Sequence, residues 1–507
     1  MTQAQVGTAH DEAQPASDRS RWIALYVLCA GMLMIVLDVT VVNVALPSIK
    51  DDLGFSQSSL AWVVNGYLIT FGGLLLLAGR LGDLLGRRRI FLIGLALFVA
   101  ASLLCGASQS EGMLIGARLL QGVGGAMTSA VILGMIVTMF PEQREQAKAV
   151  GVYAFVASAG GAVGLLLGGV VTQIISWHWI FFINAPIGLV TAILTRRLLE
   201  DDEGLGFSEG ADLLGAFLIT TSLMLGVYTI VKPAAEQGWG ASETLLLGAG
   251  SLALLALFIA REATATTPLI PLRIFRSRNV SGANTVQVLT VAGMFGMFFM
   301  GSLYLQQVLG YDALQIGLAF LPVTIIMGTL TGRYSEPLIM RFGARRLLFP
   351  GLGLVALGLA YFTRAPVNAD YVTDVLPVLV LLGTGIGISF PALMTIAMSG
   401  ATRSDAGLAS GLVNTSAQVG GAIGLAVLAT LATSRTNDLE AAGHSTASAL
   451  TSGYHLAFWV AAGLVVAAIA VAATVVEPES KAAEHFAGAE EPGELTQPGE
   501  AAYSEAA

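Results

Sequence analysis

Residues 22–46 read WIALYVLCAGMLMIVLDVTVVNVAL, an apolar run that contains a single charged side chain, Asp38. About 20 consecutive apolar residues are needed for a helix to cross the hydrocarbon core of a bilayer. Arg19 and Arg21 precede the run, which is longer than the apolar core of a cleavable secretory signal. The stretch therefore predicts a retained first membrane-spanning helix.

The rest of the chain repeats this pattern. Hydrophobic residues make up 55% of the 507 residues and charged residues only 12%, whereas a soluble domain carries about a quarter charged residues. Apolar stretches of sufficient length predict fourteen spans. They are residues 22–46, 60–79, 90–107, 113–139, 149–175, 179–198, 213–231, 243–260, 280–306, 313–330, 347–363, 375–398, 408–433 and 454–476.

The positive charges test this count, because the cytoplasmic loops of membrane proteins hold an excess of lysine and arginine. With the N-terminus inside, all but five of the 25 Lys and Arg residues fall in cytoplasmic segments. The exceptions are Lys50, Lys232, Arg364 and Arg435 in outside segments, and Arg118 within the fourth span. We therefore expect a multi-pass protein of the cell (inner or plasma) membrane, with both termini cytoplasmic.

Two similar halves are visible in the chain. The fifth span contains GGAVGL at residues 160–165, and the thirteenth contains GGAIGL at residues 420–425. The loops after the second and tenth spans also match: they carry Gly79-Arg80, Asp83 and Gly86-Arg87-Arg88 in one half, and Gly332-Arg333, Glu336, Gly343 and Arg345-Arg346 in the other. Chance similarity between glycine-rich helices is the alternative. Same-orientation repeats suit alternating access, in which two bundles rock about a central site.

This organisation predicts an all-α integral membrane protein built from two six-helix bundles and two central extra helices. The bundles are residues 22–198 and 263–476, and residues 199–262 form a linker that contains the extra helices. A cytoplasmic N-terminal tail covers residues 1–21. Residues 477–507 are rich in glutamate and predict a disordered, acidic cytoplasmic tail.

The sequence lacks the residue patterns that ATP use, nucleic-acid binding or a metal site would require. A phosphate-binding loop ends in Gly-Lys-Ser/Thr, but no lysine of this chain is followed by serine or threonine, so we expect no ATP use. The net charge of −9 argues against a nucleic-acid partner. The histidines have no metal-ligand spacing, and Cys29 and Cys105 lie in apolar spans. We expect no enzyme activity, no cofactor and no metal site.

Asp38 and Arg118 are charges predicted well inside spans, away from the span ends. An acid at the centre of a membrane helix costs about 2.5 to 3.5 kcal/mol on insertion scales, and protonation relieves this cost. A site that opens to each side in turn can therefore bind a proton outside and release it inside. A structural hydrogen bond to a neighbouring helix is the alternative for Asp38. Arg118, with Gln121 on its face, either tunes the proton affinity of the acid or ties helices together.

The loop cluster Gly79, Arg80, Asp83, Gly86, Arg87 and Arg88 lies at the cytoplasmic edge of the second and third spans. Part of it is ordinary cytoplasmic positive charge. Its regular glycines permit a tight turn, and Asp83 can accept hydrogen bonds from an arginine or from a helix N-terminus. We interpret the cluster as a conformational latch.

Small residues in the fifth span and polarisable residues in the ninth suggest further roles. Gly160, Gly164 and Gly168 recur every four residues, and Gly169 follows. This pattern predicts close helix contact, either as static packing or as a hinge that seals the cavity.

The ninth span, rich in Met and Phe, resembles an adaptable binding surface, although lipid-facing or core packing is the alternative for each residue. The predicted substrate cavity comprises Asn43, Gln121, Phe295, Phe298, Tyr304 and Gln306.

Together these residues resemble the major facilitator superfamily, and within it the fourteen-span drug:proton antiporters of the EmrB/QacA type. The resemblance covers residues 22–476. Its motifs are the first-helix stretch LDVTVVNVALP (37–47), the loop 79–89, Arg118 with Gln121 and Gly122, the stretches WHW (177–179) and NAPIG (184–188), and LYLQQVLGY (303–311). One position departs from the family: the antiporter motif normally has proline where this chain has Leu165.

The resemblance implies the major facilitator fold and export of amphipathic, drug-like molecules in exchange for protons, with Asp38 and Arg118 in proton coupling. One alternative is a dedicated exporter of a single endogenous metabolite or self-made antibiotic. A second is a lipid-handling or non-transporting membrane protein. The expected partners are a small amphipathic substrate, protons and the lipid bilayer.

Overall fold

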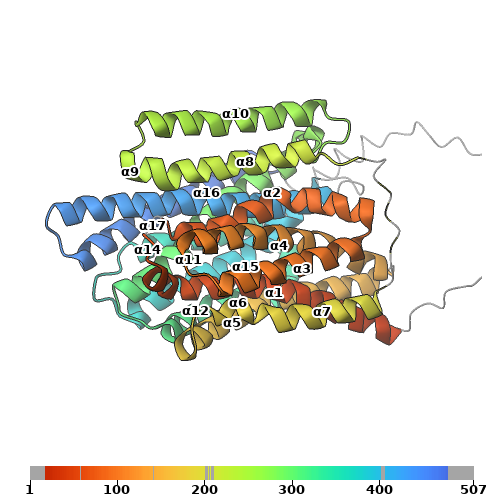
Figure 1. Cartoon of the computed structure of the whole chain (residues 1–507), viewed down its shortest axis with the longest axis horizontal. Coiled ribbons are helices and arrows are strands. Elements are labelled where there is room, and N and C mark those ends of the chain that lie inside the picture. The colour runs from red at the N-terminus through yellow and green to blue at the C-terminus, as the bar shows by residue number, and fades with distance from the viewer. Residues whose placement is uncertain are drawn as a thin grey trace, which may run out of the picture.

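The computed structural model describes residues 18–56, 59–140, 142–199, 202, 204, 206, 210–400 and 406–477. Within these ranges every regular element is a helix, and the long helices run roughly along one axis (Figure 1). Most of the two predicted tails lies outside the described residues. We call the end of the bundle at which α1 begins and α17 ends the termini end, and the opposite end the far end.

The first half of the chain forms a bundle in which α1 packs on α5 and α7, while α4 packs against both α2 and α3. Its helices are α1 (Asp18–Leu53), α2 (Ala61–Leu85), α3 (Arg87–Gly106), α4 (Glu111–Met139), α5 (Gln143–Ile174), α6 (Trp179–Phe182) and α7 (Asn184–Leu198). Ser110 caps α4, since its side chain accepts a hydrogen bond from the Met113 N–H.

A helical hairpin follows and packs on the first bundle through α8, which contacts α2. The hairpin consists of α8 (Leu213–Thr229), η2 (Ile230–Ala234), α9 (Ala235–Gln237) and α10 (Ser242–Thr264). Figure 1 shows α10 as the outermost helix, on the side of α8 away from the bundle. Only 11% of its most apolar stretch is buried by the protein, so most of this helix must face lipid.

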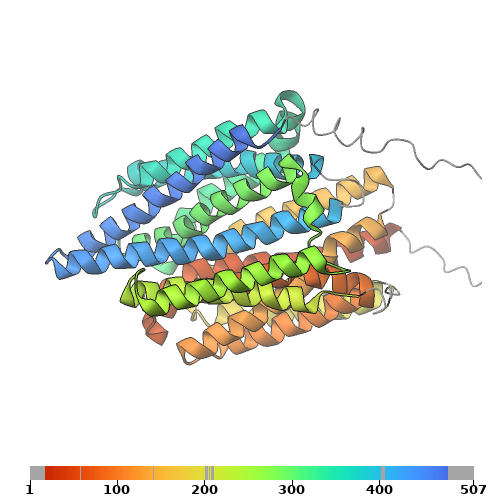
Figure 2. The ribbon, with the colours of Figure 1, turned by 90° about the horizontal axis from the view of Figure 1, so that it is seen from above.

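The second half forms the other bundle. Its elements are η3 (Leu272–Arg276), α11 (Arg278–Gln307), α12 (Ala313–Thr329), η4 (Leu330–Tyr334), α13 (Ser335–Phe342), α14 (Ala344–Phe362), η5 (Tyr371–Val375), α15 (Leu376–Ser399), α16 (Ala406–Ala441) and α17 (Thr446–Thr474). In Figure 2 the two halves lie on opposite sides, with the hairpin over the boundary between them.

Thirteen helices in the described part of the chain are long and apolar enough to cross a membrane, and each overlaps a predicted span. The predicted fifth span overlaps α5, of which only Val163–Ile174 is found as a shorter apolar segment among the described residues. The count of fourteen therefore stays a prediction. The sixth predicted span comprises α6 and α7, which are joined by the single residue Ile183 in right-handed helical conformation.

The internal repeat has a structural counterpart at the termini end. Gly86 and Gly343 both adopt positive φ, 94° and 82°, and each starts a helix, α3 or α14. Two residues later, Arg88 donates a hydrogen bond to the Arg196 carbonyl at the end of α7, and Arg345 donates to the Val476 carbonyl just past α17. Equivalent arginines therefore hold the last helix of each half in the same way.

The two bundles meet along two pairs of helices, α5 with α12 and α2 with α16. Near the far end, a Cβ atom on Gly169 would lie 2.8 Å from the Ala313 carbonyl, and one on Gly317 would lie 2.5 Å from the Leu165 carbonyl. A Cβ on Gly72 of α2 would lie 2.6 Å from the Gln418 Cβ of α16. Backbones approach this closely only where side chains are absent.

Candidate functional site

Asp38 lies in the core of the first bundle, and its side chain is about 1% exposed. Three side chains donate hydrogen bonds to its carboxylate. Arg118 Nη1 lies 2.5 Å from Oδ2, Gln121 Nε2 lies 2.6 Å from Oδ1, and Asn184 Nδ2 lies 3.3 Å from Oδ1. The three donors come from α4 and α7, so the acid of α1 ties three helices together.

Arg118 is as deeply buried as Asp38, and its guanidinium group is surrounded by acceptors. Nη1 also donates to the Gln121 side-chain oxygen at 2.7 Å, and Nε donates to the Val63 carbonyl at 2.8 Å. The guanidinium carbon lies 4.5 Å from the ring centroid of Tyr67, a cation–π contact. A buried charge is tolerated when it is paired and hydrogen-bonded in this way.

Asn184 extends the network to α3. Its side-chain amide also donates to Ser102 Oγ at 3.0 Å, and Ser102 in turn donates to the Phe181 carbonyl at 2.8 Å. Asn184 is the first residue of α7, directly after Ile183. Asn184 therefore links the acid of α1 to α3 as well as to α7.

A small cavity adjoins the carboxylate of Asp38. Its volume is about 10 Å³, and it is lined by Leu37, Asp38, Val41, Leu167, Val171, Ile180, Ile183 and Asn184. A cavity of about 10 to 15 Å³ is the minimum that admits one water molecule. The acid is thus sealed from bulk solvent in this conformation, with space beside it for about one water.

The predicted latch cluster lies at the termini end, where it contacts residues of the first half and of the linker. Asp83 accepts hydrogen bonds from the guanidinium group of Arg87, which also donates to the Gly134 carbonyl of α4. The Asp202 carboxylate accepts from the backbone N–H groups of Arg87 and Arg88 and thereby caps α3. Arg80 Nε donates to the Gly210 carbonyl.

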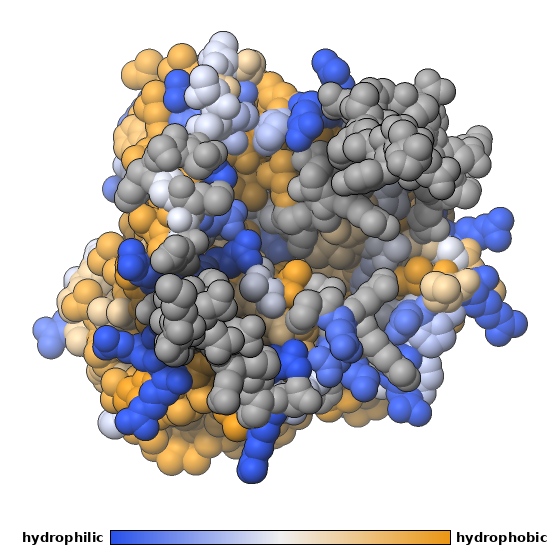
Figure 3. All heavy atoms as spheres, turned by 90° about the vertical axis from the view of Figure 1, so that its right-hand side faces the viewer, coloured by the Kyte–Doolittle hydropathy of each residue, from blue (hydrophilic) through white to orange (hydrophobic). Residues whose placement is uncertain are grey.

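Gly79 and Gly86 are the two glycines of that cluster. Gly86 needs its positive φ to separate α2 from α3, whereas a Cβ on Gly79 would meet only the Ala130 methyl group at 4.0 Å. Figure 3 looks onto this end of the molecule, where hydrophilic residues surround the face. In the described part of the chain, no residue of the second bundle pairs with Asp83.

The glycine face of α5 packs against α1. A Cβ atom on Gly160 would lie 2.9 Å from Leu33 Cδ1, one on Gly164 would overlap the Thr40 hydroxyl group, and one on Gly168 would lie 3.0 Å from Val41 Cα. Gly169 instead faces α12 of the other bundle. One helix therefore contacts both bundles, α1 through one row of glycines and α12 through Leu165 and Gly169.

The predicted substrate residues are dispersed. Asn43, Phe295, Phe298 and Gln306 are partly exposed, and Phe298 packs on Phe320 with ring centroids 5.6 Å apart. Gln121 is fully buried and belongs to the network of Asp38. Tyr304 is 1% exposed, and its hydroxyl donates to the Pro366 carbonyl, so it lies in the packed interior of the second bundle in this conformation.

The sequence-based prediction missed several members of the buried network. Asn184 donates a hydrogen bond to Asp38, and Ser102 is linked to Asp38 through Asn184. Tyr67 and Val63 contact Arg118. Asn184 stands in one of the motifs that carry the family resemblance, which was the available signal. Ser102 and Tyr67 have no such signal, because single hydroxyl groups are common in membrane helices.

Comparison with known proteins agrees with this architecture. The family model of the Major Facilitator Superfamily matches residues 28–425. The chain is 38% identical to the puromycin resistance protein pur8 of Streptomyces alboniger, over 93% of this chain and 94% of that one. It is 39% identical to the cephamycin export protein CmcT of Amycolatopsis lactamdurans, over 82% and 85% of the two chains.

Among solved structures, the fold is similar to that of a bacterial homolog of the human lysosomal transporter Spinster. The TM-score is 0.64 at 15% sequence identity, covering 92% of this chain and 98% of that one. The predicted all-α major facilitator fold and the predicted superfamily are therefore confirmed, as is transport in place of enzyme activity. The chain is a multi-pass membrane protein that belongs to the Major Facilitator Superfamily of transporters.

Proposed function

We propose that this protein exports amphipathic, drug-like small molecules from the cell in exchange for protons. The observation that carries the proposal is the Asp38 carboxylate, which is buried in the first bundle and held by Arg118, Gln121 and Asn184 from two other helices. The curated relatives support export, since they are named for puromycin resistance and cephamycin export. The plasma membrane is the compartment that suits this activity.

Proton binding to Asp38 would change the forces between helices. The charged acid attracts the guanidinium group of Arg118, whereas a neutral acid is only a weak partner for it. Protonation therefore loosens the contact between α1 and α4, and deprotonation restores it. Because α1 also packs on the glycine face of α5, and α5 contacts α12, such a change can pass to the surface where the bundles meet.

The conformation suggests the direction of access. Near the far end the bundles are in close contact, as at Gly317 with Leu165, and Ser302 of α11 donates a hydrogen bond to the Asn43 carbonyl of α1 at 2.9 Å. The arginine-rich loops lie at the termini end, which we assign to the cytoplasm by the positive-inside rule. We therefore assign the far end to the outside, closed in this state.

The proton gradient supplies enough free energy for this exchange. One elementary charge that crosses 100 mV releases about 2.3 kcal/mol. Each tenfold gradient of a neutral substrate costs about 1.4 kcal/mol. One proton per substrate molecule therefore sustains more than tenfold accumulation without ATP.

A dedicated exporter of one antibiotic is the second candidate. It is favoured by the names of the two relatives, each of which refers to one antibiotic or one antibiotic class. A panel of puromycin, a cephamycin and a lipophilic cationic dye separates the two candidates, with purified protein in proteoliposomes whose lumen is acidified.

Protons leaving the vesicles should drive substrate inward. Accumulation of several unrelated compounds supports a multidrug exporter, and accumulation of one compound supports a dedicated exporter. If substrate moves equally with and without the pH gradient, proton coupling is wrong.

A further inference from the structure

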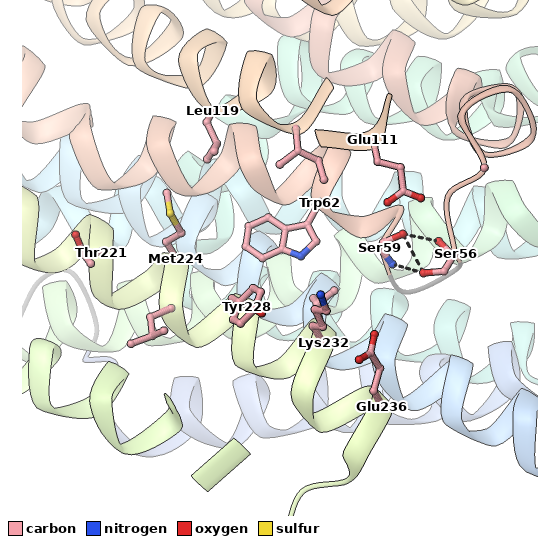
Figure 4. Close-up of a pocket in the computed structure, with 14 residues that line it drawn as sticks. Ser56, Ser59, Trp62, Glu111, Leu119, Thr221, Met224, Tyr228, Lys232 and Glu236 are labelled. Atoms are coloured by element: carbon pink, nitrogen blue, oxygen red, sulfur yellow. Dashed lines mark hydrogen bonds between the residues drawn. The ribbon is translucent and has the colours of Figure 1, made fainter. Parts of the chain in front are cut away.

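A long groove lies between the first bundle and the helical hairpin. Its volume is about 770 Å³, within the range of about 300 to 1,000 Å³ usual for small-molecule sites. It is separate from the Asp38 network and from the surface where the two bundles meet. Figure 4 shows Leu119 and Trp62 facing Met224 and Tyr228 of α8 across it.

Each of the two walls of the groove is formed by one face of one helix. Glu111, Ile115 and Leu119 recur every four residues along α4. Along α8 and its continuation, the lining residues Thr221, Met224, Leu225, Tyr228, Val231, Lys232 and Glu236 follow the three-and-four spacing of one helix face. The groove therefore runs parallel to the helices, along the direction in which lipid chains lie.

The depth of the groove and the distribution of its polar residues match one leaflet of a bilayer. From Thr221 to Lys232 the helix rises about 16 Å at 1.5 Å per residue, about half of the 30 Å hydrocarbon core. The deep part, around Leu119, Met224 and Leu225, is apolar, whereas the charged residues lie at the far end. Trp62, in the first turn of α2, sits near this mouth, as tryptophans do at membrane interfaces.

The mouth carries one positive and two negative side chains. None of the described residues forms an ion pair or a hydrogen bond with the side chain of Lys232, Glu111 or Glu236. Ser56 and Ser59, which also line the mouth, are hydrogen-bonded to each other at 2.9 Å (Figure 4). An amphiphile that fits these charges has an anionic group for Lys232 and an ammonium group for the two carboxylates.

We propose that the groove binds a zwitterionic aminophospholipid of the leaflet at the far end. An acyl chain lies between α4 and α8, the phosphate contacts Lys232, and the ammonium group contacts Glu111 and Glu236. The assignment of this leaflet as the outer one follows the orientation proposed above. Binding itself does not depend on the transport function.

An occupant of this groove would lie next to the Asp38 network. Trp62 directly precedes Val63, whose carbonyl accepts a hydrogen bond from Arg118 Nε, and Leu119 directly follows Arg118. The bound lipid therefore contacts the opposite side of the same turns of α2 and α4 that hold the guanidinium group. This position makes the lipid a structural support for the ion pair.

The test is native mass spectrometry of the full-length purified protein, titrated with phosphatidylethanolamine or phosphatidylglycerol of identical acyl chains. The expected result is one tightly bound phosphatidylethanolamine per chain, held about tenfold more tightly than phosphatidylglycerol. Lys232→Gln should weaken binding of both lipids about tenfold. Glu111→Gln with Glu236→Gln should remove the preference for the amine.

Matched controls separate this groove from other lipid contacts. Leu225→Trp fills the groove and should abolish the tight site, while Leu214→Trp, an exposed residue on the same helix outside the groove, should leave it intact. Arg364→Gln and Asp438→Asn remove exposed charges elsewhere and should change nothing. Equal binding of the two lipids by the wild type, or unchanged binding by Leu225→Trp, would overturn the proposal.

Discussion

Arg118 of α4 donates a hydrogen bond of 2.5 Å to the carboxylate of Asp38 in α1, and both side chains are about 1% exposed. The two residues are 80 positions apart in the chain. When one partner of a buried pair loses its charge, the other charge stays buried without compensation, which is strongly destabilising. The same pair is therefore a structural contact and the proposed switch for proton coupling.

Asp38→Asn should abolish accumulation driven by a pH gradient, because an amide neither binds nor releases a proton in the required range. Exchange of labelled for unlabelled substrate without a gradient should persist, since the amide still offers an oxygen to Arg118. Uptake and counterflow in proteoliposomes measure the two activities. The control is Asp51→Asn, an exposed acid on the same helix; if Asp38→Asn accumulates substrate like the wild type, Asp38 is structural.

Arg118→Gln should destabilise the protein by about 3 to 5 kcal/mol, because the Asp38 charge remains buried without its guanidinium partner. The double variant Asp38→Asn with Arg118→Gln should recover much of this loss. Thermal or denaturant unfolding of the purified protein gives the coupling free energy of the pair. Additive effects of the two changes would mean that the pair contributes no coupling, contrary to the geometry.

Gly164→Ala should separate α1 from α5, because the added methyl group would overlap the Thr40 hydroxyl group. Overpacking of a close helix contact costs about 1 to 3 kcal/mol, so we expect a lower unfolding temperature and slower transport. Gly116→Ala on α4 is the matched control, since a Cβ there meets no atom within 4 Å. Equal stability of the two variants would show that the α1–α5 contact tolerates a side chain.

Gly317→Ala should open the far end, because its Cβ would lie 2.5 Å from the Leu165 carbonyl across the boundary between the bundles. A destabilised closed state shifts the population toward the open state. The readout is labelling of Ser302→Cys by a membrane-impermeant maleimide, in a background without Cys29 and Cys105. Ser302 is fully buried here, so labelling should be slow alone and faster with Gly317→Ala.

The control for this labelling is Gly353→Ala on α14, where a Cβ meets no atom within 4 Å. It should leave the rate of Ser302→Cys labelling unchanged. Labelling that is equally fast in all three backgrounds would mean that the far end is already open in the membrane. Labelling that stays slow with Gly317→Ala would mean that this contact does not hold the bundles closed.

The span positions and the family could be predicted from the sequence. Apolar runs near 20 residues long leave a chain little choice of structure in a bilayer, because every backbone polar group must be satisfied within its own helix. The ends of the helices were less predictable. The first helix continues to Leu53, seven residues past the predicted end at residue 46, because helical hydrogen bonding does not stop where the apolar run stops.

The sequence by itself determined that Asp38 and Arg118 are costly charges in apolar surroundings, and it predicted that the chain consists of two similar halves. Only the tertiary structure decided that these two charges neutralise each other, that Asn184 and Ser102 complete their network, and that Tyr304 packs inside the second bundle. The physical reason is that hydropathy depends on each residue alone. Pairing depends on which helix faces meet, and many distant side chains determine that packing together.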